Sequence, residues 1–422
     1  MLIRKFFIVL SAVIFVGCST TEDESFAQDY TEVMLYEAYI HKEPFAFFTV
    51  DNYYTTSMFE PENGVYLGAY ILSNRHVDSN MEEFEELVGR KHALFTHKMR
   101  LGDPFPEEWL LKCIALMRTP NIILTYGNPD NPFEMRKITE TAQQLGQFYV
   151  PMILHFFPEQ RQHGFNPEEY IDFFRESRRI FAEYASNVAF VFTIFEDDVL
   201  DSDVFYPGDD YVDWVGINIF KSISEDGSPF IENTLNRFDV FYHTYGRNKP
   251  IIISGFGVSH FSTINHIYHP VLAGEQIQQF YQTILDSYPR VKAIIYMDVN
   301  TISNPTEMNY RDNFSVTANS IVLDFYRNVI QDERLLSYVD FGAGGQIIPQ
   351  LVKSPFSAYK INENFYISKN ILIYDFKKSN IAHLENYKLE LNGDTYYNLS
   401  VLQVDSIHNI YIDFTQNRII VN

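Results

Sequence analysis

Short apolar runs alternate with amphipathic patterns from about residue 65 to residue 330. The runs are rich in valine, isoleucine and aromatic residues, and they lack the strict alternation of a sheet with one solvated face. We therefore expect strands that are covered on both sides. The segments that fit are 65–72, 92–97, 121–127, 149–157, 188–195, 211–220, 250–257 and 291–299.

Amphipathic helical patterns separate these strands. Several begin with a proline and have acidic residues in the first turn, which is a typical helix start. The segments are 81–90, 106–118, 132–146, 167–185, 230–246, 275–288 and 320–330. Between the fifth and sixth strands, residues 197–210 are too rich in turn-forming residues for a helix.

Eight strands that alternate with helices predict a (β/α)₈ TIM-type barrel, which we place at residues 64–333. A doubly wound open sheet is the competing interpretation, because alternation alone does not require closure. After about residue 335 the pattern changes to short alternating runs separated by turns. We expect residues 336–422 to form a small β-rich module.

The N-terminus has the pattern of an export signal. Arg4 and Lys5 precede an apolar run at 6–16, and Gly17 and Cys18 follow it. This run is too short to span a bilayer as a stable helix. The order FVGC resembles the lipobox of bacterial lipoproteins, which implies cleavage of residues 1–17 and a diacylglyceryl thioether on Cys18.

We therefore expect residues 18–63 to form a lipidated tether and an N-terminal extension, at the outer face of a bacterial cell membrane. An ordinary cleaved signal followed by an accidental cysteine is the alternative.

The chain is acidic, with 55 acidic and 32 basic residues and a formal charge of −23. Loss of residues 1–17, which include two basic residues and no acidic one, would change that charge to −25. Such a chain repels phosphate backbones, so we do not expect nucleic acid as a partner. Cys113 lies in an apolar helical pattern, which is typical of a small core residue rather than a nucleophile.

The stretch YPGDDYVDWVGINIF at 206–220 resembles the segment that leads into the sixth strand in glycoside hydrolase family 26, the β-mannanase-like barrels. GVYLGAY at the first strand and KPIIISGFG at the seventh also fit, and the resemblance covers about residues 64–300. It implies a site for a polysaccharide or cell-envelope glycan on the loops after the strands.

The same resemblance implies which residues occupy the catalytic positions. Glu159, in FPEQRQ, stands where the family has its acid/base, and His155 stands where it has an arginine. Gly255 takes the place of the nucleophilic glutamate, and Phe220 takes the place of the tyrosine that contacts this nucleophile. A glycine cannot form a covalent glycosyl intermediate, so a retaining mechanism lacks one of its two carboxylates.

Two other carboxylates are candidates to replace the missing one. Glu196 ends the fifth strand and Asp298 ends the eighth, and either would have to activate water in an inverting scheme. The simpler interpretations are a solvated acidic loop at 196–198, with Ca²⁺ binding as a weak alternative, and a polar residue at the barrel end for Asp298. Tyr126 is the best candidate to stack on a sugar ring.

Three hypotheses follow for the function. The first is a degenerate hydrolase-like protein that binds polysaccharide or has an envelope role. The second is an active, mannanase-like β-glycanase with Glu159 as acid/base, and the third is a barrel that serves as a scaffold for protein interactions. None of the three calls for a cofactor or a metal.

Overall fold

A computed structural model describes most of the chain after residue 43. The described residues are 44–72, 76–128, 130–158, 160–222, 231–262, 265–302, 311–361, 364–378, 381–391, 394–403, 409–414 and 417–422. Cys18 and Glu159 lie outside them. The chain divides into two compact units, one of residues 50–352 and one of residues 353–422 with those up to residue 49.

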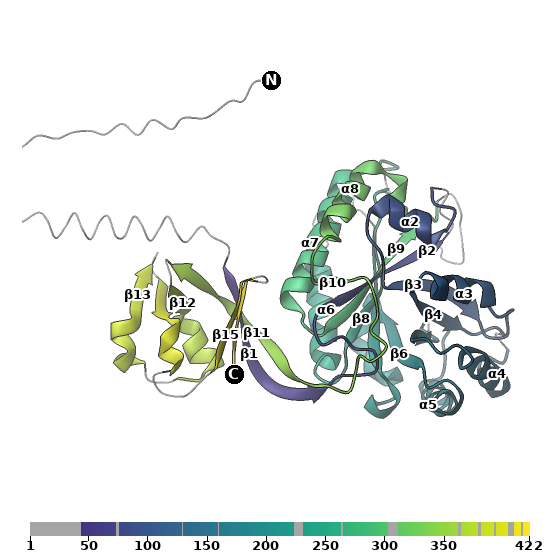
Figure 1. The fold of residues 1–422 in the computed structure, drawn as a ribbon, viewed down its shortest axis with the longest axis horizontal. Coiled ribbons are helices and arrows are strands. Elements are labelled where there is room, and N and C mark those ends of the chain that lie inside the picture. The colour runs from purple at the N-terminus through teal and green to yellow at the C-terminus, as the bar shows by residue number, and fades with distance from the viewer. Residues whose placement is uncertain are drawn as a thin grey trace, which may run out of the picture. The chain divides into compact units, whose positions relative to one another are not determined.

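The larger unit contains a closed barrel of eight parallel strands, which confirms the predicted fold (Figure 1). The strands follow one another in chain order, and the first pairs with the last over seven residues, from Tyr66 opposite Ala293 to Leu72 opposite Val299. This pairing excludes the open sheet. The strands are β2 Val65–Leu72, β3 Leu94–Arg100, β4 Thr119–Thr125, β5 Met152–Phe156, β6 Val188–Phe195, β7 Trp214–Lys221, β8 Ile251–Val258 and β9 Val291–Val299.

Helices cover the outside of the barrel, as the periodicity predicted. They are α2 Met81–Val88, α3 Glu107–Ala115, α4 Met135–Leu145, α5 Pro167–Tyr184, α6 Ile231–Tyr245, α7 Pro270–Ser287 and α8 Ser320–Val329. The start of α5 shows why the sequence pattern predicted helix starts correctly. Pro167 is the first residue of the helix, and the Asn166 side chain accepts hydrogen bonds from the amides of Glu168 and Glu169. The turn-rich stretch after β6 forms two 3₁₀ helices, η1 Glu196–Phe205 and η2 Asp209–Tyr211.

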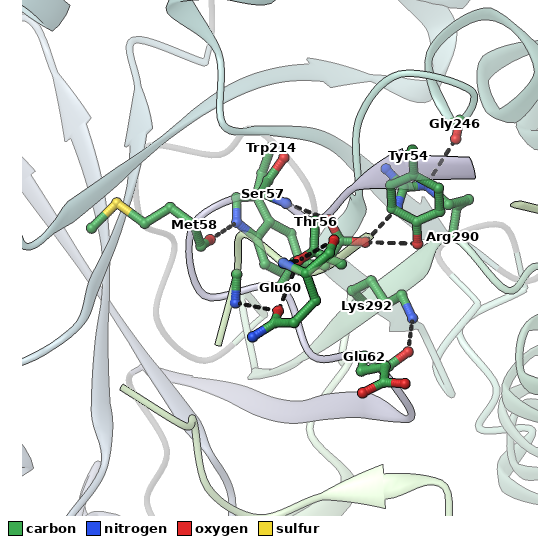
Figure 2. Close-up of polar contacts among 12 residues, drawn as sticks. Tyr54, Thr56, Ser57, Met58, Glu60, Glu62, Trp214, Gly246, Arg290 and Lys292 are labelled. Carbon is green, nitrogen blue, oxygen red and sulfur yellow. Dashed lines mark hydrogen bonds and ion pairs between the residues drawn. The ribbon is translucent and has the colours of Figure 1, made fainter. Parts of the chain in front are cut away.

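The N-terminal end of the barrel is closed by the chain that precedes β2. Trp214, at the start of β7, is fully buried inside the barrel, and its indole N–H donates to the carbonyl of Met58 at 2.8 Å. Figure 2 shows this contact beside the ion pair of Glu60 and Arg290. Since Glu60 and Arg290 are 0% and 3% exposed, the closure includes a buried polar network. Cys113, on α3, is buried as predicted.

The smaller unit is a seven-stranded sheet with the order β13-β14-β12-β11-β1-β16-β15. Its strands are β1 Phe45–Thr55, β11 Ile347–Ile361, β12 Asn364–Ser368, β13 Lys388–Leu391, β14 Asp394–Asn398, β15 Ile410–Asp413 and β16 Arg418–Val421. The sequence analysis assigned no strand to residues 45–55, yet β1 pairs in parallel with β16, from Ala46 opposite Arg418 to Thr49 opposite Val421. One further short strand, β10 Leu335–Leu336, pairs with β2 in the barrel unit.

Short helices cover one face of this sheet. They are η4 Ile371–Asp375, η5 Ala382–Tyr387 and η6 Leu399–Gln403, and their apolar residues join Phe47, Ile367 and Ile419 of the sheet in one core. A last 3₁₀ helix, η3 Val316–Ala318, belongs to the barrel unit. Among the described residues, no helix is both long and apolar enough to cross a membrane.

Candidate functional site at the C-terminal end of the barrel

Gly255 lies on β8 at a bulge, beside Asn218 of β7. A Cβ atom at this position would lie 2.8 Å from Cζ of Phe220 and 3.0 Å from Oδ1 of Asn218. The space that a side chain at residue 255 would need is therefore occupied by the Phe220 ring. A side chain here would have to displace that ring before it reached the barrel opening.

An aromatic cluster continues from Phe220 across this end of the barrel. The Phe314 ring lies 5.8 Å from the Phe220 ring, and the Phe195 ring lies 6.5 Å from it on the other side. Phe314 is 1% exposed, and its amide donates to the carbonyl of Val299 at 2.9 Å. The segment after β9 thus brings an apolar side chain over the barrel interior at this end.

His155, on β5, is fully buried in a chain of polar side chains that crosses the barrel. Its Nδ1 lies 2.8 Å from Oγ1 of Thr193 and its Nε2 lies 2.9 Å from Oδ1 of Asn121. The Asn121 amide donates to Thr96, so its oxygen is the acceptor, which assigns the proton of His155 to Nε2. Burial lowers the pKa of His155 to about 3. The imidazole is therefore neutral and supports the barrel interior.

Glu196, after β6, is 7% exposed and is paired with cations. Its Oε2 lies 2.5 Å from Nζ of Lys221, and its Oε1 lies 3.8 Å from Nη1 of Arg237. Lys221 is the last residue of β7 and Arg237 lies on α6, the helix that follows β7, so two successive β/α units meet at this ion pair. The Glu196 carboxylate is therefore engaged with two cationic side chains at this end of the barrel.

The neighbouring acids also have cationic partners. Asp197 pairs with Arg237, and Asp198 lies 3.7 Å from Nε of Arg161 and accepts from Gln162 at 3.1 Å. Burial raises the pKa of Asp198, although Gln162 and Arg161 act in the opposite direction. In the described part of the chain, no group of three or more His, Cys, Asp or Glu residues is arranged to hold a metal ion.

Asp298, on β9, does not face the barrel opening. It is fully buried, and its carboxylate accepts from the amide of Thr317 at 3.2 Å and from the Thr317 hydroxyl at 2.9 Å. Residues at alternate positions of β9 point to opposite sides, and Met297 and Val299 belong to the apolar cluster at the barrel end. This corrects the suggestion that Asp298 acts as a replacement base, because it joins β9 to the segment before α8.

Glu159 lies outside the described residues, between Pro158 and Gln160. Gln160 is 3% exposed and its amide donates to the carbonyl of Thr193 at 3.2 Å. The Gln160 side chain thus turns inward to β6. Glu159 stays a candidate acid/base on the resemblance alone.

Tyr126 follows β4 at the same end of the barrel and is half-buried. Its hydroxyl lies 3.1 Å from Nδ1 of His163, and its ring packs edge-on against His163 and Phe165 with centroid distances of 4.5 and 5.8 Å. This anchoring holds the ring in place, as a sugar platform requires. Sequence analysis missed His163, and the only signal was its position in the loop after β5.

Comparison with known proteins supports the fold. No family model matches the sequence, and no curated protein matches it. A double mutant of the Cellulomonas fimi endo-β-1,4-mannanase has a similar structure, with a TM-score of 0.51, 12% identity, and coverage of 75% of this chain and 96% of that chain.

Two further similar structures carry the family designation. A family-26 β-mannanase from Bacteroides ovatus has a TM-score of 0.47 and 12% identity, with coverage of 66% and 91%. A family-26 protein from Muricauda has a TM-score of 0.48 and 14% identity, with coverage of 65% and 87%. At 12% identity, the likeness to the Cellulomonas fimi mannanase shows the fold, a closed (β/α)₈ barrel.

Proposed function

We propose that this protein binds a polysaccharide at the C-terminal end of its barrel without hydrolysing it. The observation that carries the proposal is Gly255 at the position that corresponds to the nucleophile, with the Phe220 ring in the space of the missing side chain. Hydrolysis with retention needs a second carboxylate that faces the acid/base across the glycosidic bond.

The other carboxylates support this proposal. Glu196 is neutralised by Lys221, and Asp298 is enclosed with Thr317. Tyr126 supplies an anchored aromatic ring for a sugar face. The similar solved structures include enzymes named as mannanases, which makes β-mannan the first glycan to test.

Our first prediction is binding without turnover. In affinity electrophoresis, β-mannan should retard the protein. Tyr126→Ala should weaken this binding about tenfold, because the stacking of the ring on the sugar is lost. Incubation of the protein with β-mannan should release no reducing sugar. Tyr374→Ala is the matched control, because Tyr374 is an exposed aromatic of the smaller unit. Cleavage that disappears in Glu159→Gln would instead establish an active β-glycanase, and absence of both binding and cleavage would favour a protein-interaction scaffold.

We also propose that a lipid on Cys18 anchors the protein at the outer face of a bacterial cell membrane. The support is the order of charged residues, apolar run, Gly17 and Cys18 in the sequence. The second prediction is that Cys18→Ser moves the protein from the membrane fraction to the soluble fraction or stalls its processing, because a diacylglyceryl group supplies the attachment. Unchanged fractionation of Cys18→Ser would contradict the anchor.

A further inference from the structure

A cavity of about 370 Å³ opens at the N-terminal end of the barrel, opposite to the site described above. Three of its lining residues are large and solvent-exposed: Tyr149 is 90% exposed, Phe341 is 57% exposed and Tyr184 is 40% exposed. Its volume lies in the range of small-ligand sites. Exposed aromatic rings that surround one cavity are unusual for a surface that only faces water.

The backbone that carries these rings is anchored. The side-chain amide of Asn187 donates to the carbonyls of Phe148 and Val150, at 2.6 and 3.0 Å, and so holds the residues on both sides of Tyr149. Tyr184 ends α5, and its carbonyl lies so close to Gly146 that a Cβ atom there would approach it to 1.8 Å. The rings therefore stand on a rigid wall, which lowers the entropy lost when a ligand binds.

The buried side of the cavity has a strained backbone. Phe59 has a φ of 60°, a value that a bulky residue rarely adopts, and its amide donates to the carbonyl of Ala343 at 2.9 Å. Its ring packs against Phe341 with a centroid distance of 6.2 Å. Strain of this kind persists where surrounding contacts impose it, and it is enriched at ligand sites.

Figure 2 shows the contacts that impose it. The carboxylate of Glu60 accepts from the amide of Ser57 at 2.8 Å and from the Tyr54 hydroxyl at 3.1 Å, and it pairs with Arg290. Arg290 also lies over the Tyr54 ring, 3.6 Å from its centroid. Together with the contact from Trp214 to Met58, these bonds fix the turn that carries Phe59.

The lining also restricts the ligand's charge. Glu183 is a lining residue, and none of the residues that line the described cavity is lysine, arginine or histidine. An anionic ligand would meet a carboxylate and no counter-charge in a chain that is already strongly acidic. A neutral ring with hydroxyl groups matches both the aromatic faces and the carboxylate acceptor.

We infer that this cavity is a second carbohydrate site, which takes one end or a short stretch of a neutral polysaccharide. The ligand class rests on the proposed function, whereas the site itself does not involve the C-terminal end of the barrel. Tyr149 and Phe341 stack on sugar rings, and Glu183 accepts from hydroxyls.

Hydroxyl-radical footprinting of the full-length protein tests this site locally. Mannohexaose, cellohexaose or xylohexaose should protect Tyr149 and Phe341 severalfold from oxidation, and oligogalacturonide, which is anionic, should not. In Tyr149→Ala/Phe341→Ala, titration calorimetry should show loss of this binding event, whereas Tyr374→Ala should keep it. The replaced residues are exposed, so folding should not change.

Protection of Tyr126 reports the other end of the barrel separately. Protection of Tyr149 and Phe341 without protection of Tyr126 would support this site while the proposed function fails, and the reverse result would overturn this site alone. Absence of protection at Tyr149 and Phe341 with all three neutral probes overturns the inference. If Tyr149 and Phe341 become protected at higher protein concentration in the absence of sugar, the inference is also overturned, because this surface would then join two copies of the chain.

Discussion

At the scale of single residues, the side chains expected to do chemistry are mostly engaged with other parts of the protein. His155 bridges Thr193 and Asn121, and Glu196 is neutralised by Lys221. The contacts of His155 join strands that are adjacent in the barrel, and the contact of Glu196 joins η1, which follows β6, to β7. The polar residues at this end therefore stabilise the barrel interior, and the position of Gly255 has no side chain to contribute.

The third prediction concerns the protonation of His155. Its pKa in the folded protein, about 3, lies below the ordinary value of 6.5, so the unfolded chain binds more protons as the pH falls. The stability contributed by the neutral imidazole is complete above pH 6.5 and should decline by about 1.4 kcal/mol for each pH unit from there toward pH 3.

Urea unfolding followed by tryptophan fluorescence can measure this slope, because Trp109 and Trp214 both lie in the barrel unit. His155→Gln should remove one histidine's share of the pH dependence between pH 7 and 5. Burial also lowers the pKa of His92 to about 3, so His92 contributes the same pH dependence of stability to the unmodified protein and to His155→Gln. Equal slopes for the two proteins would contradict the assignment.

At the scale of elements, close contacts between helices depend on glycine. Gly146 follows α4 with an ordinary helical φ of −67°, so its conformation does not require glycine. The contact with the carbonyl of Tyr184, at the end of α5, does require glycine, since a Cβ atom at residue 146 would lie 1.8 Å from that carbonyl oxygen. This contact sets how closely α4 and α5 approach each other.

The fourth prediction is that Gly146→Ala lowers the free energy of unfolding by about 1–3 kcal/mol, because backbone atoms must move to admit the methyl group. Gly342→Ala is the matched control. A Cβ atom at Gly342 would lie 3.6 Å from its nearest neighbour, so stability should change by less than about 0.5 kcal/mol. Similar losses in the two variants, measured by urea unfolding, would show that the contact with Tyr184 relaxes.

At the scale of the whole molecule, a segment before the barrel closes its N-terminal end. Glu60 and Arg290 are separated by 230 residues, and both are almost fully enclosed. Removing one member of such a pair leaves the other buried without compensation. The barrel therefore depends on residues that precede its first strand.

The fifth prediction is that Glu60→Gln lowers the free energy of unfolding of the barrel by about 3–5 kcal/mol, the usual cost of breaking a buried ion pair. Glu140→Gln is the control, because Glu140 and Arg136 form an exposed pair one helical turn apart, where the loss should be about 0.5 kcal/mol or less. If the two variants lose similar amounts in urea unfolding, the pair does not close the barrel.

The sequence alone determined the alternation of strands and helices, whereas closure into a barrel became evident from the pairing of β2 with β9. Apolar runs covered on both sides admit few arrangements, and the helix starts, such as Asn166 and Pro167, act within one turn of chain. That residue 255 is a glycine could also be read from the sequence, because it depends only on which residue stands there.

The surroundings of each side chain, by contrast, depend on how distant segments fold together. Asp298 turned away from the barrel opening because alternate residues of β9 face opposite sides, and Glu196 met Arg237 from a helix about 40 residues away. The pairing of β1 with β16 joins residues 46–49 to residues 418–421, and no local pattern encodes it. Contacts between distant residues depend on how the elements pack, and packing is a property of the whole fold rather than of any segment.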